Sequence, residues 1–183
     1  VRHGVSTVLS RTADEEDPTW QECQEANASG ADLAVSFHAN AGGGDGFEVF
    51  HWGTDTNGKK LAQISEKYVK QLGQNSRGVK VGDHLYFISH TAMTAVLFES
   101  FFLDNDKDND IGDTIAEQKA FGVAYAKAIL EYYGIAYKEP VVAPATKKLY
   151  HVQVGAYGVK ANAESMLKKV KAAGFSDAFI KEG

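Results

Sequence analysis

The chain has 183 residues, of which 44% are hydrophobic and 23% charged, and its net charge is -5. This composition is that of a globular protein and excludes a disordered or collagen-like chain. Nucleic acid is a poor candidate partner because nucleic-acid-binding proteins usually carry a basic patch. No apolar run reaches the roughly 18 residues of a membrane span, and the single cysteine, Cys23, excludes an internal disulfide.

Five short segments have the composition of β-strands, being rich in β-branched, aliphatic or aromatic residues without helical spacing. They are residues 4–9, 33–37, 46–52, 85–88 and 95–98. The run 33–37 is apolar without alternation, as expected of a strand that is covered on both faces. It therefore predicts a central strand.

Helices are predicted between these strands. Asp17 suits an N-cap and Pro18 the first position of a helix that Gly30 ends. Residues 59–72 and 111–133 carry apolar side chains at helical spacing and end at glycines. The stripe expected to be buried on the longer helix consists of Ile115, Gly122, Ala126, Ile129 and Tyr133. Strands that alternate with helices predict an α/β fold.

The pattern changes after residue 136. Residues 137–148 hold two of the three prolines and predict an extended linker. Residues 150–156 alternate as a strand does, Asn162 suits the cap of a helix, and residues 178–180 predict the start of a further strand. These elements are too few to bury a core, so we expect a module that is cut short.

His38 is the first candidate for chemistry. It follows the apolar run 33–37 and precedes the glycines 42–44, so its imidazole is expected at the carboxyl end of a strand, where sites form in α/β sheets. A neutral imidazole is the commonest metal ligand. The alternative is a hydrogen-bonded structural histidine.

Glu99 is the second candidate, because it is embedded in the apolar run 95–103. Burial raises the pKa of a carboxyl group toward the range that is useful for proton transfer. The alternative is a buried ion pair, but no basic residue lies nearby before Lys107. We expect Glu99 and His38 to lie side by side at one end of a sheet.

An acidic segment offers a competing signal. Residues 106–112 and Glu117 have the carboxylate spacing of a calcium loop, but Gly112 comes one place late for the sharp turn. The alternative is an acidic loop before a helix, whose dipole favours negative charge at that end. Calcium binding by the loop 104–113 stays open from the sequence.

The motifs around His38 and Glu99 resemble those of the zinc-dependent N-acetylmuramoyl-L-alanine amidases, which cut peptidoglycan. They are Ser-Phe-His-Ala-Asn at 36–40 and Ala-Val-Leu-Phe-Glu-Ser-Phe-Phe-Leu-Asp-Asn at 95–105, with support from residues 4–12 and 26–32. The resemblance covers most of residues 1–135. It implies a mixed β-sheet flanked by helices and a Zn2+ ion held by two histidines and one glutamate. It assigns His38 as a zinc ligand and Glu99 as the catalytic residue.

In that family the other histidine and the glutamate ligand lie on a segment before the Arg-Thr motif, found here at residues 11–12. The sequence has no such segment, and His3 lies too close to the motif to replace it. We therefore expect an N-terminally truncated catalytic domain that binds zinc poorly and is inactive by itself. The alternative is that His51, His84 or His90 completes the site.

The tail resembles the start of a SPOR domain, a small module that binds glycan strands, on the motif Val-Gln-Val-Gly-Ala-Tyr at 152–157. A generic strand-helix unit is the alternative. The expected domains are a catalytic domain at 1–136, a linker at 137–148 and a partial SPOR-like module at 149–183.

The resemblance implies zinc-dependent hydrolysis of the amide bond between N-acetylmuramic acid and L-alanine in peptidoglycan. The expected location is the cell wall or the outside of the cell, or release at lysis for a phage-encoded protein. The alternative is a noncatalytic peptidoglycan-binding protein with a degenerate amidase domain.

Overall fold

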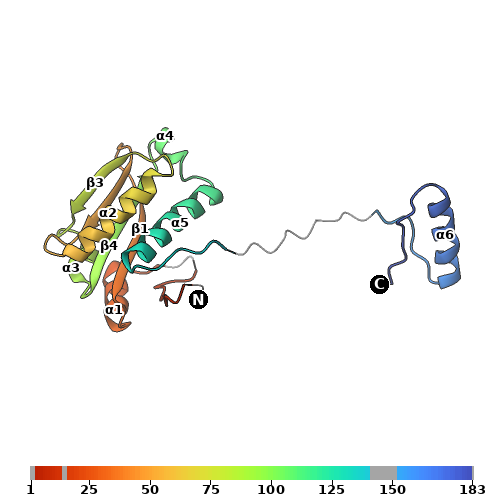
Figure 1. Ribbon diagram of the computed structural model, residues 1–183, viewed down its shortest axis with the longest axis horizontal. Coiled ribbons are helices and arrows are strands. Elements are labelled where there is room, and N and C mark those ends of the chain that lie inside the picture. The colour runs from red at the N-terminus through yellow and green to blue at the C-terminus, as the bar shows by residue number, and fades with distance from the viewer. Residues whose placement is uncertain (1–2, 14–15, 141–151, 183) are drawn as a thin grey trace. The chain divides into compact units, whose positions relative to one another are not determined.

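The computed structural model describes residues 3–13, 16–140 and 152–182. The chain divides into two compact units, Val1–Glu139 and Pro140–Gly183, which we describe separately (Figure 1). Among the described helices, none has both the length and the apolarity needed to cross a bilayer.

The larger unit is built on a four-stranded mixed sheet with the strand order β1-β4-β2-β3. The strands are β1 (Leu33–Asn40), β2 (Phe47–His51), β3 (Ser76–Val81) and β4 (Thr94–Phe102). β1 runs parallel to β4 and β3 runs parallel to β2, whereas β2 and β4 are antiparallel. The expected α/β class with a mixed sheet flanked by helices is confirmed.

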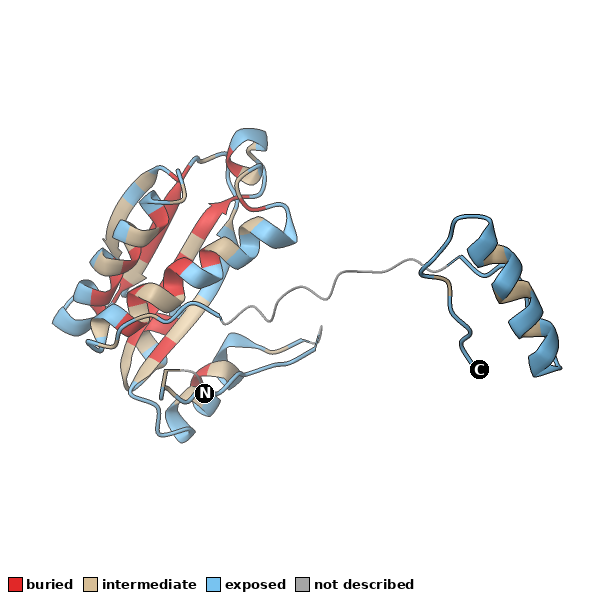
Figure 2. Ribbon diagram, turned by 45° about the vertical axis from the view of Figure 1, so that its right-hand side comes forward, coloured by how far each residue is buried: buried red, intermediate tan, exposed pale blue. Residues whose placement is uncertain are grey.

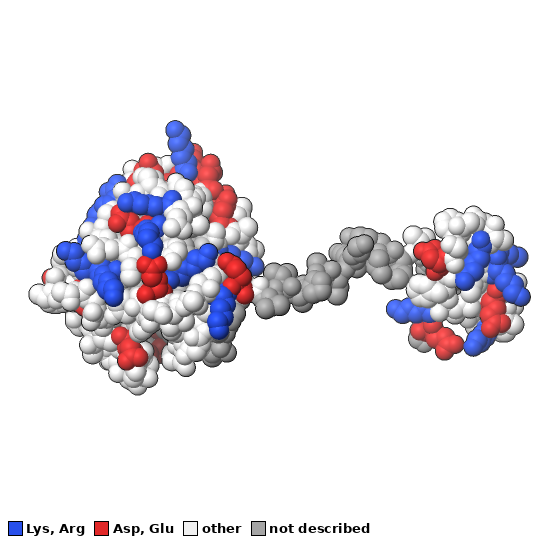
Figure 3. Space-filling view, viewed as in Figure 1, with Lys and Arg blue, Asp and Glu red and all other residues white. Residues whose placement is uncertain are grey.

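Helices α2 (Thr56–Lys70) and α5 (Ile115–Tyr132) cover one face of this sheet (Figure 1). Their inner sides and the strands form the main core, in which Phe47 and Phe98 are fully buried (Figure 2). Burying one such side chain contributes about 1.5–3 kcal/mol. On the outer surface of these helices basic and acidic side chains are interspersed (Figure 3). Lys67 of α2 and Glu131 of α5 form one ion pair there, with 2.6 Å between Nζ and Oε1.

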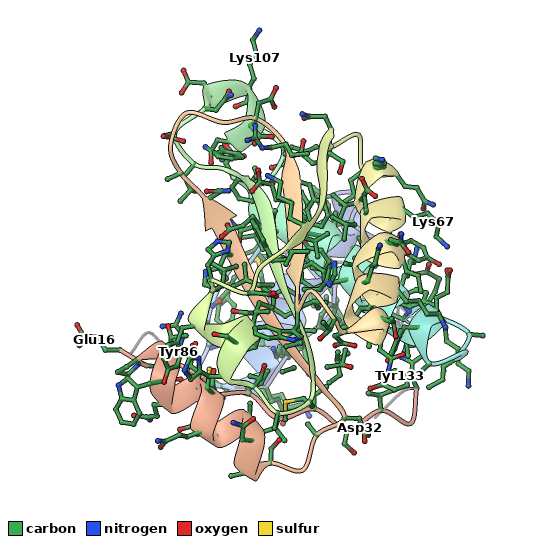
Figure 4. The ribbon with its side chains drawn as sticks, turned by 90° about the vertical axis from the view of Figure 1, so that its left-hand side faces the viewer. Glu16, Asp32, Lys67, Tyr86, Lys107 and Tyr133 are labelled. Carbon is green, nitrogen blue, oxygen red and sulfur yellow. The ribbon has the colours of Figure 1, made fainter. Side chains whose placement is uncertain are left out.

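Helices α1 (Thr19–Ala28) and α3 (Tyr86–His90) pack on the other face. The cluster that they form includes Ala95 and Leu97 of β4. Because side chains alternate along a strand, Glu99 projects from the same face two residues further on. Glu99 lies beyond the helix-covered cluster, toward the end of β4 that leads to α4 (Asp106–Asn109). Figure 4 shows Lys107 of α4 at one end of the unit and Asp32 and Tyr133 at the other.

Three predicted strands differ from the structure. Residues 4–9 form no strand, and Val8 and Leu9 are 72% and 69% exposed, because no described strand pairs with them. β1 lies at an edge of the sheet rather than in its centre. Residues 85–88 fall in the cap and first turn of α3, since their apolar side chains pack on α1 and β4 in a helical conformation. β3 was not predicted, because Arg77, Gly78 and Lys80 interrupt any strand pattern.

The four predicted helices form as α1, α2, α5 and α6 (Lys160–Ala172), but their ends and faces differ, and α3 and α4 were not predicted. The N-cap of α1 is Pro18 rather than the predicted Asp17, and no side chain caps this helix. α2 begins earlier than predicted, because the Asp55 side chain accepts a hydrogen bond from the Asn57 amide at 2.9 Å. On α5, Phe121 and Tyr125 are buried whereas Ile115 is 71% exposed, so the large aromatic rings set the buried side.

The smaller unit contains α6 (Lys160–Ala172), whose N-cap is Val159, so that Asn162 lies inside the helix rather than at its cap. Residues 152–156 and 178–180 form no strands, since within 152–182 they have no strand to pair with. No side chain in 152–182 is buried (Figure 2). The predicted linker beyond residue 140 and the predicted strand residues 150 and 151 lie outside the described residues.

Candidate active site

His38, Glu99 and Glu48 lie in one row across the sheet. His38 of β1 and Glu99 of β4 are register partners on parallel strands, and Glu48 of β2 is the antiparallel partner of Glu99. Side chains at paired positions project from the same face of a sheet. The two residues singled out from the sequence are therefore neighbours at the carboxyl ends of their strands, and Glu48 is a third member that the sequence did not reveal.

Glu99 carries the most perturbed carboxyl group of the row. Its Oε2 atom is buried and has no hydrogen-bond partner among the described residues. Burial, followed by the negative charge of Glu48, raises the pKa of Glu99 to about 7. A carboxyl group with this pKa exists in both protonation states near neutral pH, which suits it to accept and return a proton.

Glu48 has the opposite character, although it is only 5% exposed. Lys80 Nζ donates to its Oε1 at 2.6 Å, and the Nε of Arg77 donates to the same oxygen. Burial acts to raise the pKa of Glu48, but the hydrogen bonds and charges of Lys80 and Arg77 hold that pKa below its usual value. Glu48 is therefore an ionised carboxylate beside Glu99. In the sequence, Glu48 stood out only as a charged residue within a predicted strand of bulky aromatic residues.

His38 presents a neutral imidazole at the edge of the row. Its Nε2 lies 2.7 Å from the Ser36 hydroxyl oxygen. Desolvation of the ring lowers the pKa of His38, and the nearby charge of Glu22 on α1 opposes this shift. The hydroxyl of Ser36 fixes the ring from one side, which leaves Nδ1 as the nitrogen that suits a metal.

The glycine loop, residues 41–46, follows His38 and is tied to the segment that follows Glu99. The Asp104 carboxylate accepts hydrogen bonds from the amides of Gly42 and Gly43, both at 2.8 Å. Asn105 donates to the Gly44 carbonyl at 2.9 Å, and the Gly46 amide donates to Asp108 at 2.9 Å. The two segments beyond the row are therefore held together.

The acidic segment 104–113 uses its side chains within the fold. Asp108 is 3% exposed and also accepts hydrogen bonds from the Phe102 amide and the Gln74 side chain, both at 2.6 Å. Asn105 caps α4, and Glu117 forms a capping box with Thr114 at the start of α5. Asp108 and Glu117, two of the carboxylates in the pattern that resembles a calcium loop, therefore have structural roles in the fold.

The donor set for a metal is incomplete in the described part of the chain. Within residues 3–13, 16–140 and 152–182, no three His, Cys, Asp or Glu side chains are arranged to hold a metal ion. His51 is buried with Nδ1 2.7 Å from the Trp52 carbonyl oxygen, His84 packs edge-on against Phe50, and His90 stacks on Tyr86. His38 thus fits as one ligand, but the described residues do not form a full zinc site.

Comparison with known families now identifies the chain. The profile of the N-acetylmuramoyl-L-alanine amidases matches residues 1–131, which is most of the sequence. The chain belongs to this amidase family. A SPOR domain profile matches residues 126–183, so the amidase is followed by a SPOR domain, as the tail motif suggested.

Curated relatives agree with this membership. The chain is 32% identical to the N-acetylmuramoyl-L-alanine amidase CwlM of Bacillus licheniformis over 179 residues, or 96% of this chain and 67% of CwlM. It is 30% identical to a sporulation-specific N-acetylmuramoyl-L-alanine amidase of Bacillus subtilis, over 94% of the chain and 66% of the relative. It is 36% identical to the endolysin of Bacillus phage SPP1, over 67% of the chain and 50% of the endolysin. The chain therefore spans about two thirds of the length of the two Bacillus amidases.

Solved structures show the same fold. The catalytic domain of the amidase CwlV from Paenibacillus polymyxa has a TM-score of 0.64 and 28% identity, covering 70% of this chain and 73% of that domain. The amidase AmiC2 of Nostoc punctiforme has a TM-score of 0.67 and 26% identity, covering 73% and 75%. The amidase fold thus agrees with the sheet and helices described above.

Proposed function

We propose that the larger unit hydrolyses the amide bond between N-acetylmuramic acid and L-alanine of peptidoglycan, with Glu99 as its proton-transfer group. The observation that carries this proposal is the row His38–Glu99–Glu48, in which Glu99 has a pKa of about 7 and a buried oxygen with no hydrogen-bond partner among the described residues. Glu99 takes a proton from the attacking water as the water oxygen bonds to the amide carbon. When the C–N bond breaks, Glu99 gives that proton to the leaving amine of L-alanine.

Zinc dependence is a separate part of the proposal. His38 would be one ligand, through the nitrogen that does not contact Ser36. The described residues do not complete the set, so two further ligands must come from other groups, and we derive no step through the metal. We expect the 183-residue chain by itself to bind zinc poorly and to cleave peptidoglycan at most slowly.

A chimera tests both parts. A family segment with a histidine and a glutamate ligand is placed ahead of Arg11, and zinc content and new alanine amino termini from purified peptidoglycan are measured. The chimera should bind zinc and cleave. Glu99→Gln should keep the zinc and lower turnover by about 10²-fold or more, the usual contribution of a general acid-base group. His38→Ala should lose the zinc. A chimera that cleaves equally well with Glu99→Gln would refute the role of Glu99.

We further propose that the SPOR domain binds glycan strands stripped of their stem peptides and so keeps the amidase on its polymer. The enzyme would act in the cell wall, outside the cell or after phage-mediated lysis. The domain limits 1–136, 137–148 and 149–183 belong to this proposal, and the division between the two compact units after Glu139 falls inside the proposed linker.

A second function is favoured because the described residues hold no complete donor set for a metal. The chain would then be a noncatalytic peptidoglycan-binding protein with an amidase fold. In that case the chain would sediment with insoluble peptidoglycan without cleaving it. A gene that encodes a histidine and a glutamate ligand ahead of Arg11, and whose whole product cleaves peptidoglycan, would exclude this alternative.

A further inference from the structure

A pair of cations lies next to the candidate active site, on β3, the strand that borders the row on the Glu48 side. β3 follows β2 in the sheet, and both Arg77 and Lys80 of β3 donate to the same oxygen of Glu48. One cation is enough to neutralise one carboxylate. The group therefore keeps one surplus positive charge beside the row, in a chain whose net charge is -5.

A β-bulge directs Arg77 to this place. The register of β2 with β3 shifts between Phe47 and Glu48, so that Ser76 pairs with Phe47 and Gly78 pairs with Glu48. Arg77 is the extra residue, and a bulge turns a side chain away from the face that regular alternation would give it. Gly78, with a φ of +97°, supplies the backbone conformation that the bulge requires.

The two cations are exposed to solvent, whereas the Glu48 carboxylate is buried. The side chains of Arg77 and Lys80 are 42% and 36% exposed, against 7% for Glu48. The guanidinium of Arg77 lies 5.2 Å from the ring centre of Phe102, and the ammonium of Lys80 lies 5.9 Å from that of Phe50. These rings restrict the two side chains, whose remaining N–H groups can donate to a ligand.

We propose that Arg77 and Lys80 bind a carboxylate on the second residue of the stem peptide, counted from the scissile bond. They would therefore favour stems in which this group is a free carboxylate over stems in which it is an amide. This inference rests on the proposed amidase function of Glu99. Two strand spacings separate β4 from β3, roughly 10 Å. Two extended peptide residues span roughly 7 Å, so a stem bound with its amide at Glu99 brings its second residue within reach of the cations.

The test uses the whole 183-residue chain and two ligands that differ by one charge. They are N-acetylmuramoyl-L-alanyl-D-glutamic acid and its isoglutamine form, in which the α-carboxylate is an amide. Dissociation constants are measured by NMR titration at low and high salt. We expect the acid to bind about fivefold more tightly at low salt, as for a partly exposed charge pair, and the preference to shrink at high salt.

Substitutions separate this role from a structural one. Lys80→Gln leaves Arg77 to neutralise Glu48 but removes the surplus charge, so the preference for the acid should disappear, and Lys80→Arg should keep it. Lys59→Gln, an exposed change of equal charge on α2, should leave the preference intact. Equal affinity of the chain for both ligands, or a full preference in Lys80→Gln, overturns the inference and leaves the amidase proposal standing. If the chain binds neither ligand, the result counts against both the inference and the amidase proposal.

Discussion

Glu48 and Glu99 face each other across the antiparallel strands β2 and β4, and only Glu48 is neutralised by cations. The pKa values of the two carboxyl groups are consequently shifted in opposite directions. The pKa of Glu48 is lowered, and that of Glu99 is raised to about 7. One glutamate thus keeps its charge while its neighbour exchanges a proton.

The raised pKa of Glu99 predicts a loss of stability with rising pH. The folded state holds a proton that the unfolded chain releases at the ordinary value of 4.5. The free energy of unfolding should therefore fall between about pH 4.5 and pH 7 and change no further from this cause above that range. Each pKa unit corresponds to about 1.4 kcal/mol, and solvent screening reduces the expected loss to about 1–2 kcal/mol.

Urea unfolding of the metal-free chain at pH 5 and pH 8 measures this loss, with Glu99→Gln as the control. The variant has no proton to lose at this site, so its stability should change less between the two pH values. Equal changes in both proteins would contradict the raised pKa.

Glu48→Gln should lower the pKa of Glu99. The substitution removes the negative charge next to Glu99 and leaves Arg77 and Lys80 without their carboxylate. Burial, which is the larger cause of the shift, remains, so the pKa should stay above 4.5. Carboxyl carbon NMR gives the value directly. Glu131→Gln, on the exposed side of α5, serves as the control that should leave the Glu99 titration unchanged.

Asp108→Asn should destabilise the larger unit. The Asp108 carboxylate accepts from the Gly46 and Phe102 amides and from Gln74, all out of contact with solvent. An amide offers one acceptor oxygen and no charge, so we expect a cost of about 2–3 kcal/mol in unfolding free energy. Chemical denaturation measures it. The neighbouring exposed Asp106→Asn should change stability by less than about 0.5 kcal/mol. Similar costs for both variants would show that the buried contacts of Asp108 do not matter.

The smaller unit should be locally unstable. α6 has no buried residue, and an isolated helix of this length is marginal in water. Its amides should exchange with deuterium much faster than those of β4, whose side chains are largely buried. Hydrogen exchange followed by NMR decides this, and equal protection of α6 and β4 would mean that the helix is stabilised by contacts beyond those seen in residues 152–182.

Local rules predicted the parts of the fold that depend on neighbouring residues. Gly30 and Gly134 follow their helices in the left-handed conformation, and the apolar run before Glu99 is a buried strand. Residues 85–88 show the limit of such rules, because a four-residue apolar run fits one turn of helix as well as a strand. The edge position of β1 depends on pairing between distant segments, which no local pattern encodes.

The candidate site divides in the same way. His38 and Glu99 stand in motifs that can be recognised along the sequence. The part played by Glu48 depends on Arg77 and Lys80, which reach it only through the pairing of β2 with a bulged β3. A bulge in a charged, glycine-containing segment leaves no strand signal, so neither the strand nor its ion pairs could be predicted.

The position of β1 also affects how the protein behaves in solution. Within the described residues β1 pairs with β4 alone, its first five residues carry no charge, and Phe37 is 55% exposed. An open, uncharged strand edge is a template on which another chain can add a strand. Concentrated preparations of the 183-residue chain should therefore associate through this edge, and the apparent molar mass from light scattering should increase with protein concentration even where the chain remains folded.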